Sequence, residues 1–276
     1  MEKKSRKDYP IGVFDSGVGG LTVVREIMRQ IPKERIIYFG DTARVPYGSK
    51  SKETVTRYSE QIVRFLKTQE VKAIVIACNT ASAYALEEIE KKLDIPIIGV
   101  VKPGAKTASE VTVNGKIGVI ATEGTIQSKI YTKYIEELGV LAEVIGKACP
   151  LFVPLVEEGL LEDPVTDEIA QRYLSGLIDS GIDTLILGCT HYPLIRSTVK
   201  RVMGESVTLV NPAYETALEL KQLLAENRIL QDEKPALGTK QYQFFVSDGA
   251  DKFQHFANTI FKYGVLAVKQ INIEEF

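Results

Sequence analysis

The sequence predicts an α/β protein built from two similar halves, each with a parallel sheet flanked by helices. The first observation is a regular alternation of short apolar runs with helical patterns, the rhythm of βα units. The second is that two apolar runs, 72–77 and 183–188, each end in a small residue followed by a cysteine. The third is that landmarks of the first half recur after 106, 111 and 109 residues: Ile11 and Ile117, Cys78 and Cys189, Pro103 and Pro212. Because order and spacing agree, we favour an internal duplication over a chance resemblance of unrelated units.

The strands of the first half are expected where aliphatic and aromatic residues run without polar alternation, as in strands buried on both faces. These segments are 10–14, 35–39, 72–77 and 95–101. Helices are expected where apolar residues recur at intervals of three and four, in segments 21–31, 52–69 and 81–93. Pro32 ends the first helix, and the glycine-containing segments 15–20 and 40–48 form turns and loops.

The second half begins with an expected strand at 116–121 and includes the strand at 183–188. The remaining tail predicts further α/β elements: a helix at 214–227, a polar loop at 231–240, a strand at 242–246, a helix at 251–260 and a strand near 267–268.

The composition is that of a globular protein, with 276 residues, 45% hydrophobic and 25% charged. This length favours two domains of ordinary size. A net charge of −2 gives the chain no electrostatic reason to bind nucleic acid or an anionic membrane. We find no signal segment and no apolar run long enough to span a membrane. Three widely spaced cysteines favour free thiols, and we therefore expect a reducing, cytoplasmic location.

The turn at 17–20 has the glycines of a ligand-binding turn but not the dinucleotide fingerprint, because position 22 is threonine where a third glycine is needed. The chain has no GxxxxGK[ST] phosphate loop either. We expect a tight strand-to-helix turn whose amides face a ligand anion.

Cys78 and Cys189 are the strongest candidates for chemistry. A single cysteine at the end of a buried strand is usually an inert core residue. Here the placement occurs twice, at strand ends where α/β proteins bind ligands, and each cysteine precedes residues that suit a helix start. A helix N-terminus lowers the pKa of a thiol, so we expect two reactive thiols that face one ligand from opposite sides. The spacing does not favour a metal site, and Cys149 has no counterpart and is interpreted as packing.

Other polar residues at the predicted strand ends complete the candidate site. Asp15 and His191 lie next to the two cysteines in the expected layout and are candidates for proton transfer. Asp15 also suits helix capping. Asp41 is a further acid candidate, whereas Glu157 can be either functional or a plain surface charge. Hydroxyl groups for a ligand carboxylate are supplied by Ser16, Thr80, Thr122 and Thr190, while Tyr47 and Gly48 are expected to close over the ligand.

Five ordered motifs resemble the glutamate racemases of the aspartate/glutamate racemase family, which need no cofactor. The motifs are IGVFDSGVGGLT at 11–22, GDTARVPYG at 40–48, ACNTA at 77–81, CPLFVP at 149–154 and GCTHYP at 188–193. The resemblance extends over essentially the whole chain. The turn at 15–22 and the loop at 46–48 favour glutamate over aspartate as the substrate.

This resemblance implies two doubly wound, flavodoxin-like domains related by a pseudo-two-fold axis, with the active site between them. The first domain would comprise 1–101 and 209–276 and carry Cys78, and the second would comprise 102–208 and carry Cys189. Cys78 would remove the proton from D-glutamate with help from Asp15. Cys189 would remove it from L-glutamate with help from His191 and Glu157. Asp41 belongs to a family motif with a less defined role. The resemblance assigns substrate contacts to Asp15, Ser16, Tyr47, Gly48, Asn79, Thr80, Thr122, Thr190 and His191.

The resemblance also implies a homodimer and a supply of D-glutamate for peptidoglycan in the cell wall. It implies no cofactor, and we find no place for the lysine and phosphate cup of pyridoxal phosphate. Three alternatives stay open at this point: a racemase of another acidic amino acid such as aspartate, a two-lobed module that only binds an amino acid, and a thiol redox protein. The lack of a CxxC motif disfavours the redox protein.

Overall fold

The computed structural model describes residues 5–233, 240–261 and 267–276. Its strands form two sheets in which all pairs are parallel. The larger sheet has the order β10-β9-β2-β1-β3-β4. These strands are β1 (Ile11–Asp15), β2 (Ile36–Gly40), β3 (Ala73–Ile76), β4 (Ile97–Gly99), β9 (Tyr242–Val246) and β10 (Val268–Gln270).

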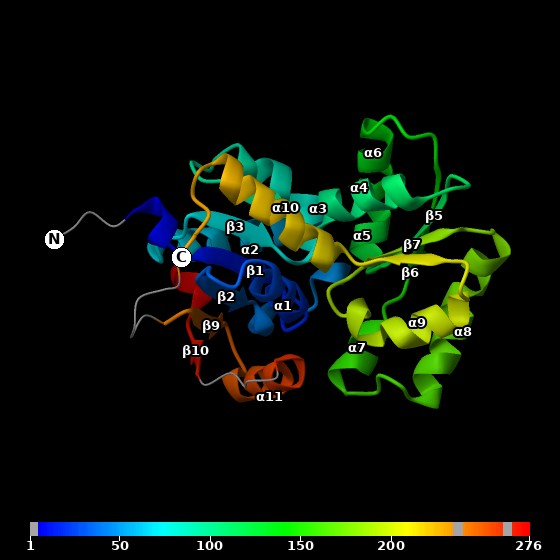
Figure 1. Ribbon diagram of the computed structural model, residues 1–276. Coiled ribbons are helices and arrows are strands. Elements are labelled where there is room, and N and C mark those ends of the chain that lie inside the picture. Colours follow the sequence, from blue (N-terminus) through cyan, green and yellow to red (C-terminus); the bar gives the residue numbers. More distant parts are fainter. Residues whose placement is uncertain (1–4, 234–239, 262–266) are drawn as a thin grey trace.

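The smaller sheet has the order β6-β5-β7-β8 and forms a second lobe beside the first (Figure 1). Its strands are β5 (Lys116–Ala121), β6 (Glu143–Ala148), β7 (Thr184–Gly188) and β8 (Thr208–Val210). Within each half the strands follow the order second, first, third, fourth, as in flavodoxin-like folds. The two cysteines therefore follow equivalent strands, β3 and β7.

Helices cover both faces of each sheet, as the buried side chains show. On one face of the larger sheet lie α1 (Leu21–Gln30), α10 (Pro212–Glu226) and α11 (Ala250–Ile260), and on the other lie α2 (Lys52–Thr68) and α3 (Asn79–Glu90). One face of the smaller sheet is covered by α4 (Val101–Val111) and α6 (Ile130–Glu137). The other is covered by α7 (Phe152–Glu157), α8 (Pro164–Asp179) and α9 (Arg196–Met203). The short α5 (Glu123–Gln127) follows β5.

The predicted α/β fold with parallel sheets is confirmed, and the strands expected in both halves and in the tail are present. The larger sheet takes strands from both ends of the chain, because β9 and β10 extend it beyond β2. The polar loop predicted at 231–240 lies largely outside the described residues. Cys149 is fully buried, as expected for a packing residue, and His255 is exposed.

Helix α4 was not predicted, because Pro103 and Gly104 suggested a turn after the expected strand at 95–101. Pro103 is the third residue of this helix, where the backbone N–H groups have no partner inside the helix and a proline is tolerated. Gly104 is required by packing, since a Cβ atom there would lie 2.9 Å from Cγ of Pro212 at the start of α10. The two helices that connect the lobes therefore pack closely.

Candidate active site

The two cysteines lie at the carboxyl ends of β3 and β7 and are both buried, with exposed fractions of 6% and 7%. Cys78 is the N-cap of α3, and its Sγ accepts a hydrogen bond from the backbone N–H of Ala81 at 3.4 Å. Both are free thiols. Their charges interact, since an ionised Cys189 disfavours ionisation of Cys78. The two buried thiols therefore lie near enough for the charge of one to act on the other.

The expectation of a lowered thiol pKa is wrong for Cys78. Burial, and then the negative charge of Asp15, raise the pKa of this thiol to about 12. The N–H of Ala81 and the hydroxyl of Ser16 act in the opposite direction but are outweighed. The helix N-terminus is present as predicted, but burial destabilises the thiolate more than the helix N-terminus stabilises it.

Cys189 belongs to a chain of three side chains. Its Sγ lies 3.8 Å from Nδ1 of His191, and Nε2 of the same imidazole lies 3.1 Å from Oε1 of Glu157 at the end of α7. Burial alone would lower the pKa of His191, but the hydrogen bonds to Cys189 and Glu157 outweigh it and raise the pKa to about 10. The same contact lowers the pKa of Glu157. The structure thus brings together the imidazole, carboxylate and thiol that the sequence singled out.

Asp15 ends β1 and is 1% exposed. Its Oδ2 accepts hydrogen bonds from the backbone N–H groups of Gly17 at 3.1 Å and Gly20 at 3.0 Å. Its Oδ1 is buried and has no hydrogen-bond partner among the described residues. Burial raises the pKa of Asp15, against the charge of His191 and the backbone N–H groups around it. Asp15 thus binds the turn that precedes α1, and its charge acts on Cys78.

The glycine-rich turn of the first lobe fits against the Cys189 loop of the second. A Cβ atom on Gly19 would lie 2.3 Å from Oγ1 of Thr190 and 2.5 Å from Nδ1 of His191. The hydroxyl of Thr22 donates to the carbonyl oxygen of Thr190 at 2.8 Å. Gly19 therefore permits a close approach between the lobes.

Three threonine hydroxyls meet across the lobe boundary, one from the first lobe and two from the second. Oγ1 of Thr80 lies 2.8 Å from Oγ1 of Thr122 and 3.1 Å from Oγ1 of Thr125, and the last two are 3.0 Å apart. Thr125 was not singled out in the sequence, although its position three residues after Thr122 on a helix could have indicated it. Gly48 packs against this group, because a Cβ atom there would lie 2.6 Å from Cβ of Thr122.

Asp41 and Tyr47 lie in a separate polar network. The Asp41 carboxylate accepts hydrogen bonds from Nε of Arg44 at 2.8 Å, from Oγ of Ser247 at 2.9 Å and from the hydroxyl of Tyr47. No hydrogen bond joins Asp41 to either cysteine within the described residues. The side chain of Tyr47 is 1% exposed, and its hydroxyl donates to Asp41.

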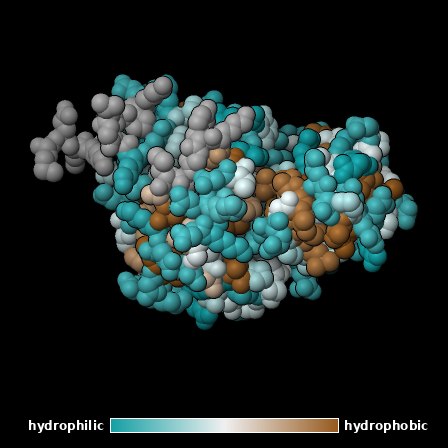
Figure 2. All heavy atoms as spheres, turned by 90° about the horizontal axis from the view of Figure 1, so that it is seen from below, coloured by the Kyte–Doolittle hydropathy of each residue, from teal (hydrophilic) through white to brown (hydrophobic). Residues whose placement is uncertain are grey.

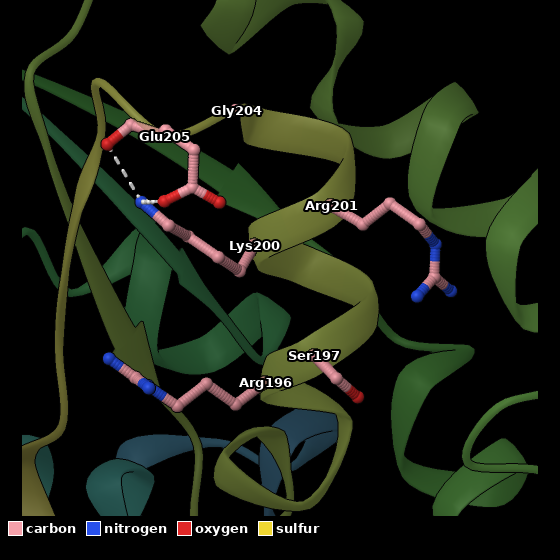
Figure 3. Close-up of a pocket in the computed structure, with 6 residues that line it drawn as sticks. All are labelled: Arg196, Ser197, Lys200, Arg201, Gly204 and Glu205. Carbon is pink, nitrogen blue, oxygen red and sulfur yellow. Dashed lines mark hydrogen bonds and ion pairs between the residues drawn. The ribbon is translucent and has the colours of Figure 1, made fainter.

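The space beside Cys189 is small. Asn79, Cys189 and Thr190 line a cavity of about 10 Å³ between the lobes, which holds no more than one water molecule. A larger cavity of about 550 Å³ lies on α9 and contains none of the candidate residues (Figure 3). Two of its cations are paired, since Lys200 contacts Glu205 and Arg201 contacts Asp167. Across the described ranges, no cluster of three metal-ligating side chains occurs, and no helix has the length and hydropathy to cross a membrane.

Comparison with known proteins gives one consistent result. Residues 11–219 match the sequence model of the Asp/Glu/Hydantoin racemase family. The glutamate racemase of Geobacter metallireducens is 49% identical over 264 residues, covering 96% of this chain and 97% of that protein. A glutamate racemase isoform from Bacillus anthracis superimposes with a TM-score of 0.91 at 45% identity, covering 96% of this chain and 98% of that one. The glutamate racemase of Francisella tularensis, solved in complex with D-glutamate, gives a TM-score of 0.90 at 38% identity, with 98% and 100% coverage.

Proposed function

The chain belongs to the Asp/Glu/hydantoin racemase family, and from this premise we propose that it interconverts L- and D-glutamate with two thiols and no cofactor. The relatives that it resembles over nearly their whole length are glutamate racemases. The observation that supports the mechanism is that two buried thiols follow equivalent strands of the two sheets. Each has its own polar partner: Asp15 near Cys78, and His191 with Glu157 beside Cys189.

Inversion at Cα requires one group to remove the proton while another delivers a proton to the opposite face. In our proposal the thiolate of Cys78 takes the Cα proton of D-glutamate, and the thiol of Cys189 gives its proton to the other face. The products are L-glutamate, a Cys78 thiol and a Cys189 thiolate, and the reverse reaction starts from that state. Protonated His191 stabilises the Cys189 thiolate.

The Cys78 thiolate needs a cation, because burial and the charge of Asp15 both disfavour it. The substrate supplies one in its α-ammonium group. The free Oδ1 of Asp15 is suited to accept a hydrogen bond from that group. The α-ammonium group of the bound substrate therefore favours the Cys78 thiolate. A high pKa of this thiol in the protein without substrate is for that reason compatible with catalysis.

The intermediate carries its negative charge on the substrate carboxylate as an enediolate, which fixed hydrogen-bond donors stabilise. We assign this task to Asn79, Thr80, Thr122 and Thr190, with Ser16 and Gly48 completing the contacts. Asp41 is assigned a positioning role instead of proton transfer, because its oxygens are held by Arg44, Ser247 and Tyr47.

Incubation of the purified protein with single enantiomers of glutamate and aspartate in deuterated water tests this function. We expect racemisation of glutamate without added cofactor, deuterium at Cα of the product, and little reaction of aspartate. A faster reaction with aspartate would support the alternative function, a racemase of another acidic amino acid. Binding of glutamate without exchange of the Cα proton would identify a binding module and refute the proposal.

The wider biological assignments follow from the same reading. We propose domains of 1–101 with 209–276 and of 102–208, a cytoplasmic location, and a role in supplying D-glutamate for peptidoglycan.

We also propose a homodimer. Exposed apolar side chains support it: Leu151, Leu160 and Val165 of the second lobe are 47%, 37% and 53% exposed. Figure 2 shows hydrophobic side chains gathered on one face of this lobe. Sedimentation at micromolar concentration would distinguish a dimer from a monomer.

A further inference from the structure

One hydrogen bond crosses from the second lobe to the residue beside Cys78. The hydroxyl of Tyr131, on α6, donates to Oδ1 of Asn79 at 2.7 Å. Asn79 is the first residue of α3, directly after Cys78. Both side chains are buried, with 3% and 4% of their surface exposed. A tyrosine 52 residues away in sequence thus holds the amide that follows a reactive thiol.

The ring of Tyr131 is fixed by two glycines. A Cβ atom on Gly188, the residue before Cys189, would lie 3.3 Å from Cε2 of the ring, and one on Gly104 would lie 3.5 Å from Cε1. The ring therefore packs against the end of β7 and the start of α4. Burial, and then the charge of Cys189, raise the pKa of Tyr131 far above its ordinary value, so the hydroxyl remains a donor at any working pH.

The amide of Asn79 can face a ligand in two ways. With Oδ1 held by Tyr131, the amide NH₂ group is left to donate elsewhere, and it donates no hydrogen bond within the described residues. Asn79 follows Cys78 directly and also lines the small cavity beside Cys189. A flipped amide would turn its oxygen toward a substrate carboxylate and leave the Tyr131 hydroxyl without an acceptor.

We propose that Tyr131 is a positioning residue that fixes the Asn79 amide with its NH₂ group toward the substrate carboxylate. This inference rests on the proposed racemase function and adds a residue that does not itself touch the substrate. Because the contact crosses the lobe boundary, the donor is aligned only when the lobes are docked.

A double-mutant cycle of Tyr131→Phe and Asn79→Ala tests this proposal. Tyr131→Phe keeps the ring and removes only the hydroxyl, and we expect kcat/KM for glutamate to fall by about three- to tenfold, the worth of one hydrogen bond. In the Asn79→Ala background the same change should alter kcat/KM by less than about twofold, because no amide remains to be oriented. An equal loss in both backgrounds, or no loss in the wild-type background, would overturn the proposal.

Tyr134→Phe is the matched control. Tyr134 lies on the same helix and is also buried, but its hydroxyl has no hydrogen-bond partner among the described residues. This variant should retain full kcat/KM, and a loss equal to that of Tyr131→Phe would indicate only a disturbed helix and count against the proposal.

Calorimetric titration of D-glutamate into the wild type, the two single variants of the cycle and the double variant gives a readout that does not need turnover. Tyr131→Phe should weaken D-glutamate binding only where Asn79 is present. If the wild type binds glutamate but does not racemise it, the proposed function fails while this binding cycle still decides the role of Tyr131. Additive losses in affinity would refute the positioning role even if racemisation is confirmed.

Discussion

Gly19 and Thr190 come from different lobes and lie so close that a Cβ atom on Gly19 would be 2.3 Å from Oγ1 of Thr190. The same atom would be 2.5 Å from the His191 ring. The first turn of one lobe is thus shaped to the loop that carries the other thiol. The site depends on the fit of the two lobes as much as on its reactive groups.

Gly19→Ala should lower kcat/KM by about a hundredfold, because the added methyl group must displace Thr190 or His191, and misplacement by about 1 Å can cost that much. Circular dichroism of the glutamate enantiomers measures the rate. Gly176→Ala is the control, since Gly176 lies in α8 with no atom within 4 Å of an added Cβ. That variant should retain full activity, and similar losses in both would contradict the packing argument.

The imidazole of His191 should remain protonated well above its ordinary range, since its pKa is raised to about 10. Proton NMR can follow it, because the chain has only two histidines and His255→Gln assigns the signals. Cys189→Ser removes the largest stabilising contact and should lower the pKa of His191. An unchanged titration in that variant would mean that the thiol does not hold the imidazolium.

The same shift makes stability depend on pH. A folded pKa of about 10, above the ordinary value of 6.5, means that protonation of His191 stabilises the folded protein. This contribution is fully present below pH 6.5 and is lost as the pH rises through 10. Denaturant unfolding should therefore show wild type losing stability relative to His191→Asn between these values. A constant difference would contradict the assignment.

Glu157→Gln should weaken the support of His191 and lower kcat/KM about tenfold, as expected for loss of a charged hydrogen bond. The loss must be equal in both directions, because the equilibrium constant between enantiomers is one. The individual values of kcat and KM should change by different amounts in the two directions, since only the reaction of L-glutamate starts from the Cys189 thiolate. Glu158→Gln is the control, because Glu158 is exposed. Equal effects of the two changes would argue against a relay.

Lys72 should contribute to stability without affecting the chemistry. Its Nζ lies 2.6 Å from Oε2 of Glu34 and donates to the carbonyl oxygens of Lys7 and Ile229 at 2.7 and 2.8 Å. Lys72→Met leaves Glu34 buried without its cation and should cost about 3–5 kcal/mol in urea unfolding. The double variant with Glu34→Gln should lose less, because no unpaired charge remains. An equal or larger loss in the double variant would contradict this explanation.

The sequence was sufficient to predict the parallel α/β fold and the two cysteines, because strand ends are visible in the apolar pattern. It also pointed to His191 and Glu157. It did not indicate Tyr131, whose role comes from a contact across the lobe boundary that no local pattern encodes. Thr125 was overlooked, although its spacing from Thr122 was visible in the sequence. The predicted low pKa of Cys78 was wrong because the helix terminus is a local feature that the sequence shows, whereas the depth at which the thiol is buried in the packed core is not. Helix α4 was missed because its proline and glycine suit a turn equally well.

The most direct test of the central claim is the racemisation rate of Cys78→Ser and Cys189→Ser, with Cys149→Ser as the control. Cys149 is buried outside the proposed reaction, and its replacement should leave most of the activity. Each of the other two changes removes one of the two proton-transfer groups, and we predict that racemisation falls at least about a thousandfold. Full racemisation by either variant would contradict a reaction that needs both thiols.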